Sequence, residues 1–117
     1  MAYVYFIQEG DDGPIKIGLA RTDIGVYKRL EDLQVGNPRT LRLRAALPGD
    51  LDMEIGFHET FADTRIRGEW FEPSDDLETI VEFAEHIFRE RPVPDELRLR
   101  MDVVAEKDNR RLATTAR

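Results

Sequence analysis

The hydrophobic and polar positions in the first half of the chain predict three β-strands. Residues 2–8 and 15–20 are rich in Val, Ile, Tyr and Phe, and "EGDDGP" between them supplies the Gly, Asp and Pro of a hairpin loop. The stretch 40–47, "TLRLRAAL", alternates strictly, with Leu41 and Leu43 on one face and Arg42 and Arg44 on the other. This alternation indicates a third, half-buried strand.

Helical spacing follows the second and the third of these segments and recurs further along the chain. Thr22 or Asp23 caps a helix with apolar residues at positions 26, 30 and 33, which "GNP" at 36–38 stops. Further helices are predicted over about 51–62, after a turn and cap formed by Pro48, Gly49 and Asp50, after a Ser74 cap, and over 95–105. The segment "RIRGEWF" is predicted to be a loop with a short extended piece. The pattern predicts an α+β fold in which a small three-stranded antiparallel sheet is flanked by helices. Residues 1–90 form one domain, and residues 91–117 form a C-terminal helix and a flexible tail.

The second predicted helix carries two polar residues within its apolar arc. Glu54 and His58 fall among Leu51, Ile55, Phe57, Phe61 and Ala62, and they are spaced so that their side chains meet. A buried carboxylate requires compensation. Two interpretations are open: a structural pair of Glu54 with His58 or a nearby Arg, or a cleft in which Glu54 holds a divalent cation with assistance from His58.

Two further side chains have competing interpretations. Arg29 borders the apolar stripe of the first helix, so it either ionises outward or directs its guanidinium into the same cleft, where it suits phosphate oxygens. Trp70 and Phe71 are interpreted as core residues.

Composition and charge limit the cellular compartments and the kinds of binding partner with which the sequence is compatible. The 117 residues include no cysteine, which excludes disulfides and thiolate metal sites and is compatible with the cytoplasm, and no apolar run is long enough to span a membrane. The net charge of −7 argues against a general nucleic-acid binder, yet residues 16–44 hold seven basic side chains against three acids. The acids concentrate in 69–90, which, like the C-terminal segment, is a candidate surface for a second copy or a protein partner.

Several short motifs, taken together, resemble a known family. "YVYFI" followed by "IKIG" resembles the paired strand motifs of the GIY-YIG nuclease superfamily. A short phage and bacterial branch of that superfamily has a similar order of "KIG", "RLEDLQVGNP", "EIGFHETF" and "GEWF". The resemblance covers about residues 3–81. Lys16 stands where the family name has its second Tyr, a replacement that is usual in this branch.

The resemblance implies a divalent-metal-dependent endonuclease that hydrolyses phosphodiester bonds of DNA, with RNA also open. Glu54 would bind Mg²⁺ or Mn²⁺, with Glu69 as a second candidate ligand, and Tyr5 would deprotonate or orient the attacking water. Because a phenol has an ordinary pKa near 10, this role requires Lys16 and the metal to favour the phenolate. Arg29 would stabilise phosphoryl charge, and His58 would assist proton transfer or orient Glu54.

The expected nucleic-acid contacts are basic side chains distributed over the domain. They are Arg21, Lys28, Arg39, Arg42, Arg44, Arg65 and Arg67. The alternative function is a catalytically weak or inactive nucleic-acid-binding module of the same fold, acting within a larger assembly. A third, an acidic protein that mimics DNA or docks to a partner, is less favoured.

Overall fold

A computed structural model of the chain describes residues 1–90, so the predictions for residues 91–117 lie outside the described part. The predicted α+β class is confirmed, but the sheet has five strands rather than three. The elements in chain order are β1 (Tyr3–Glu9), β2 (Ile15–Ala20), α1 (Asp23–Gln34), β3 (Leu41–Pro48), α2 (Leu51–Thr60), a 3-10 turn (Ala62–Thr64), β4 (Arg65–Arg67), β5 (Trp70–Phe71) and α3 (Asp75–Glu90).

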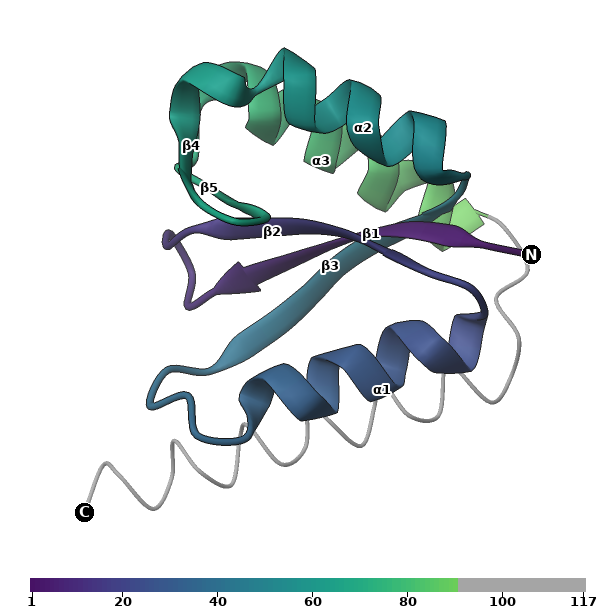
Figure 1. Ribbon diagram of the computed structural model, residues 1–117, viewed down its shortest axis with the longest axis horizontal. Helices are drawn as coiled ribbons and strands as arrows, with labels where there is room; N and C mark the ends of the chain where they lie inside the picture. The colour runs from purple at the N-terminus through teal and green to yellow at the C-terminus, as the bar shows by residue number, and fades with distance from the viewer. Residues whose placement is uncertain (91–117) are drawn as a thin grey trace.

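The sheet is antiparallel throughout, with the strand order β3-β1-β2-β5-β4. Helix α1 lies on one face, and α2 and α3 lie on the other (Figure 1). The two additional strands come from the segment that was read mainly as a loop. There Gly68 and Glu69 form a two-residue turn, and Gly68 has a φ of 57°, as the first central position of a type II′ hairpin requires.

Each face of the sheet carries its own apolar cluster because successive strand residues point in opposite directions. Val4 and Phe6 of β1 pack beneath α2 and α3, whereas Tyr5 and Ile7 pack beneath α1. The predicted division of this strand into two faces is therefore confirmed, and Tyr5 lies on the face that α1 covers.

Local side-chain hydrogen bonds set the limits of α1. Thr22 caps its start, where its Oγ1 accepts from the Gly25 N–H at 2.9 Å. After its end, the Gln34 side chain donates to the Arg39 carbonyl at 2.9 Å and accepts from the Leu41 N–H at 2.8 Å. Gly36 takes a φ of 77° in this loop. The "LQVGNP" motif thus joins α1 to β3.

The caps of α2 and α3 match the predicted ones, but the predicted buried arc of α2 is only partly right. Asp50 and Ser74 accept from the N–H groups of Met53 and Leu77. Leu51 is 54% exposed and Ile55 42% exposed, and Ala62 is also exposed, so these three residues do not face the core. The side of α2 that faces the sheet holds Glu54, Phe57, His58 and Phe61.

Candidate active site

Tyr5 is centred on the α1 face of the sheet, and its ring lies directly over Gly18 of the neighbouring strand. The two residues are register partners between β1 and β2. A Cβ atom at position 18 would lie 2.2 Å from Tyr5 Oη and 2.3 Å from Tyr5 Cζ, which leaves space for glycine only. The Gly of "KIG" is therefore the floor on which the Tyr5 phenol rests, and Tyr5 itself is 1% exposed.

Lys16 is held on the same strand by an acid from the new hairpin. Its Nζ lies 2.7 Å from Glu69 Oε2 and 5.7 Å from the centre of the Trp70 ring. The hairpin turn is itself attached to β2, because the Ile17 N–H donates to the Glu69 carbonyl at 3.0 Å. The "GEWF" motif thus places one acid against Lys16, Trp70 beside it, and Phe71 fully in the core.

Helix α2 contributes Glu54 and His58. Glu54 is 9% exposed, the most buried residue of its helix. His58 Nε2 donates to the Ile17 carbonyl at 2.8 Å, which fixes the proton on Nε2 and leaves Nδ1 as the position that can exchange one. Its ring also packs against Phe71 with a centroid separation of 5.1 Å. His58 therefore anchors α2 to β2 as well as standing one turn from Glu54.

Electrostatic interactions link these side chains. Burial and the charge of Glu69 raise the pKa of Glu54, whereas His58 and Lys16 act to lower it. Burial raises the pKa of Tyr5 far above 10.0, and Glu69 and Glu54 raise it further, while Arg29 opposes them through its charge and a hydrogen bond. Residues from β1, β2, α1, α2 and the β4–β5 turn therefore act on one another.

The raised pKa of Tyr5 favours one of the two roles predicted for it, orienting the attacking water, over the other, deprotonating it. The phenolate was expected to be favoured by Lys16, but Lys16 is paired with Glu69, and burial together with two carboxylates disfavours the charged form. This arrangement therefore favours the neutral hydroxyl of Tyr5. Its oxygen can accept a hydrogen bond from a water and its proton can be donated, so it is suited to orienting a nucleophile.

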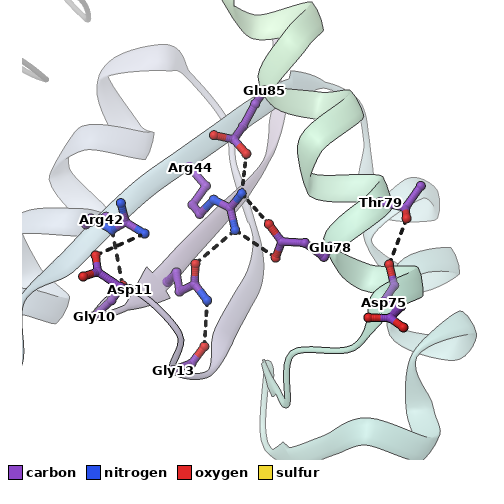
Figure 2. A network of polar contacts seen from close by, with 10 residues as sticks. Gly10, Asp11, Gly13, Arg42, Arg44, Asp75, Glu78, Thr79 and Glu85 are labelled. Atoms are coloured by element: carbon purple, nitrogen blue, oxygen red, sulfur yellow. Dashed lines mark hydrogen bonds and ion pairs between the residues drawn. The ribbon is translucent and has the colours of Figure 1, made fainter.

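Arg44 does not lie on an open polar face as the alternation of β3 predicted. The register between β1 and β3 shifts at Phe6/Ile7, and the side chain of Arg44 is only 12% exposed. Its guanidinium contacts Glu78 and Glu85 of α3 and donates to Gln8 Oε1 at 3.0 Å (Figure 2). Hydrogen bonding to Glu78, with Glu85 adding to it, raises the pKa of Arg44.

This network has a structural function that sequence reasoning missed. Gln8 is 2% exposed, and its Nε2 also donates to the Gly13 carbonyl in the β1–β2 loop at 3.0 Å. The chain of contacts in Figure 2 therefore joins that loop through Gln8 and Arg44 to α3. We accordingly exclude Arg44 from the candidate nucleic-acid interface. The sequence signal for this network was Gln8, a polar residue within the apolar run of β1.

The other six predicted basic contacts are all exposed and fall into three groups. Arg39 is 3.3 Å from Glu9, and Arg42 is 3.8 Å from Asp11, both at the sheet end near the first loop. Arg65 donates to the Gly68 carbonyl at 2.7 Å and so braces the hairpin. The remaining three, Arg21, Lys28 and Arg67, are exposed, as is Arg29.

The donor set around Glu54 is compatible with a magnesium-type ion rather than with an all-protein metal cage. Within residues 1–90, no group of three or more His, Cys, Asp or Glu side chains is placed to hold a metal. Mg²⁺ is commonly bound by one or two carboxylates, with waters and substrate phosphates completing its shell. Glu54 and Glu69 are the two carboxylates that could serve such an ion, because the charge of Glu69 acts on Glu54, but Glu69 would first have to leave Lys16.

Comparison with protein families shows which family this chain belongs to. The T5orf172 domain matches residues 2–88, from the start of β1 almost to the end of α3. The chain belongs to the T5orf172 domain family. T5orf172 is a phage-associated domain that is linked to nuclease-like proteins, and the match includes every side chain of the site described above. No curated protein and no solved structure matches the chain.

The described residues of this T5orf172 domain also bear on the membrane question. Among residues 1–90, none of the helices combines the length and apolar character needed to cross a bilayer.

Proposed function

We propose that this protein is a divalent-metal-dependent endonuclease of GIY-YIG type that hydrolyses phosphodiester bonds of DNA. The observation that carries the proposal is that a phenol, a lysine, an arginine and two carboxylates from five different elements are close enough to act on one another electrostatically. Membership of the T5orf172 family supports the nuclease class, and the motifs "YVYFI", "KIG" and "GEWF" support the GIY-YIG assignment.

The proposed roles follow from the contacts. Glu54, with Glu69, would hold Mg²⁺ or Mn²⁺, which when bound polarises the scissile phosphate and neutralises the leaving oxygen. Tyr5, as a neutral phenol over Gly18, orients the attacking water through its oxygen lone pair. Arg29, exposed on α1 and electrostatically coupled to Tyr5, would stabilise the charge that develops on the phosphoryl oxygens.

Lys16 and His58 support these groups from β2 and α2. Lys16 forms an ion pair with Glu69. Its ammonium would therefore become available to a phosphate oxygen when the Glu69 carboxylate leaves Lys16 to bind the metal ion. His58 keeps its Nε2 proton on the Ile17 carbonyl, so only Nδ1 can take part in a proton transfer. We assign His58 first to positioning α2, and through it Glu54.

Cleavage of a supercoiled plasmid and of linear and single-stranded DNA with Mg²⁺ or Mn²⁺, with and without chelator, tests the proposal. We expect metal-dependent cleavage that Glu54→Gln abolishes, because the amide keeps the shape of the side chain and loses the charge that holds a cation. Circular dichroism checks that the variant is folded. Undiminished cleavage by a folded Glu54→Gln variant would show that Glu54 is not the metal ligand.

A nucleic-acid-binding module of the same fold is the second candidate. It is favoured by the 2.7 Å pair of Lys16 with Glu69, which occupies a carboxylate that the metal needs, and by the raised pKa of Tyr5. This candidate predicts DNA binding that depends on salt and persists in chelator, with no cleavage under any metal.

A further inference from the structure

The cross-strand register places three side chains in one row on the α1 face of the sheet. Lys16 of β2 is the register partner of Trp70 of β5, and Trp70 is the partner of Arg67 of β4. Directly paired residues in an antiparallel sheet point to the same face. The row Lys16–Trp70–Arg67 therefore runs outward from the candidate active site to the edge of the sheet.

Trp70 differs from its neighbour in this row. Phe71 is fully buried on the opposite face, as predicted for both aromatics, but Trp70 remains partly exposed. Its ring lies 5.7 Å from Lys16 Nζ and packs at the margin of the α1-side cluster. A partly exposed indole whose register neighbours on both sides are cationic resembles the arrangement by which proteins stack a nucleic-acid base beside its phosphates.

We propose that Trp70 is a stacking platform for an unpaired base of the DNA strand, with Arg67 contacting an adjacent phosphate. The inference rests on the proposed function, since it requires DNA to lie on the α1 face. It also names the preferred substrate class. A base within a duplex has both faces covered by its neighbours, so only single-stranded, frayed or branched DNA presents a base to Trp70.

The protein contains one tryptophan, so its fluorescence reports on Trp70 alone. We would titrate the whole protein, in chelator to prevent turnover, with oligo(dT) and with a blunt hairpin duplex, following tryptophan emission and the anisotropy of labelled DNA together. We expect oligo(dT) to quench the emission and to bind about 10- to 100-fold more tightly than the duplex.

Variants separate stacking from charge. Trp70→Leu should bind oligo(dT) about 10- to 100-fold more weakly, and Trp70→Phe, which keeps an aromatic face and guards against loss of fold, should retain most of the affinity. Arg67→Gln should reduce the salt dependence of binding, whereas the matched control Arg89→Gln on α3 should not.

The outcomes distinguish this inference from the proposed function. Oligo(dT) binding with unchanged emission, or equal affinity for duplex and oligo(dT), would overturn the stacking role even if the protein cleaves DNA. Quenching by oligo(dT) without any metal-dependent cleavage would contradict the nuclease proposal and support Trp70 as the platform of a binding module.

Discussion

Replacing Gly18 with alanine gives a direct test of the site, because the distances from the added Cβ to the atoms around it are known from the structure. The new Cβ would lie 2.2 Å from Tyr5 Oη, 2.3 Å from Cζ and 2.8 Å from Cε1, and ordinary contact begins near 3.4 Å. The hydroxyl must therefore retreat by about 1.2 Å, the difference between 3.4 and 2.2 Å. Because Tyr5 is 1% exposed, its ring has little space in which to move.

Both activity and stability should respond. A displacement of about 1 Å in a catalytic group commonly reduces turnover by about 100-fold. Overpacking a buried position typically lowers the free energy of unfolding by about 1–3 kcal/mol. We expect Gly18→Ala to cleave DNA about 100-fold more slowly than the parent under single-turnover conditions. Its unfolding in urea should still be cooperative.

A double-mutant cycle shows whether the loss passes through the Tyr5 hydroxyl. If it does, Tyr5→Phe should reduce cleavage strongly in the parent and add little in the Gly18→Ala background, because the hydroxyl is already out of place. Fully additive losses would mean that Gly18 affects catalysis by another route.

Gly56 of α2 supplies the matched control. A Cβ at this position meets nothing within 4 Å, and alanine is the better helix former, so Gly56→Ala should keep full cleavage and gain about 1 kcal/mol of stability. A Gly18→Ala protein as active as Gly56→Ala would refute the placement of Tyr5 at the reacting centre.

Two further predictions concern stability. Arg44→Gln should lower the free energy of unfolding by about 2–4 kcal/mol in urea titrations, because it leaves the carboxylates of Glu78 and Glu85 together without their cation. Arg42→Gln should change it by less than about 0.5 kcal/mol, since its pair with Asp11 is exposed, and equal effects would contradict the network. The second prediction is a pH dependence. Burial raises the pKa of folded Glu54 above the ordinary 4.5, so the native state binds this proton more tightly than the unfolded chain does. The free energy of unfolding should therefore fall as the pH rises from the unfolded pKa through the folded pKa. Glu54→Gln should therefore be more stable than the parent at neutral pH and lose this advantage as the pH falls to about 4.5, whereas a pH-independent difference would refute the burial argument.

Much of the fold was predictable from local patterns. The Val, Ile, Tyr and Phe content of their segments located β1 and β2, and period-2 alternation located β3. The cap residues, with Thr22 or Asp23 as candidates for α1 and Asp50 and Ser74 for α2 and α3, located the three helix starts. All of these signals depend only on neighbours in the chain. The hairpin β4–β5 was read mainly as a loop because its strands are three and two residues long. So few residues cannot show a period, and their pairing with β2 supplies the hydrogen bonds that make them strands.

The same division applies to the site. The residue pattern alone predicts that Glu54 is a polar residue in an apolar helical arc, that Tyr5 shares a face with Ile7, and that acidic and basic residues are segregated along the chain. The pairing of the charges, in contrast, depends on how the elements pack. Arg42 and Arg44 look alike in the alternating strand, yet a register shift and the packing of α3 bring Arg44 against two acids from 34 and 41 residues away. Lys16 likewise meets Glu69 because a turn folds back on β2. Such pairings arise from packing between elements distant in sequence, and the local periodicity of neither partner encodes them.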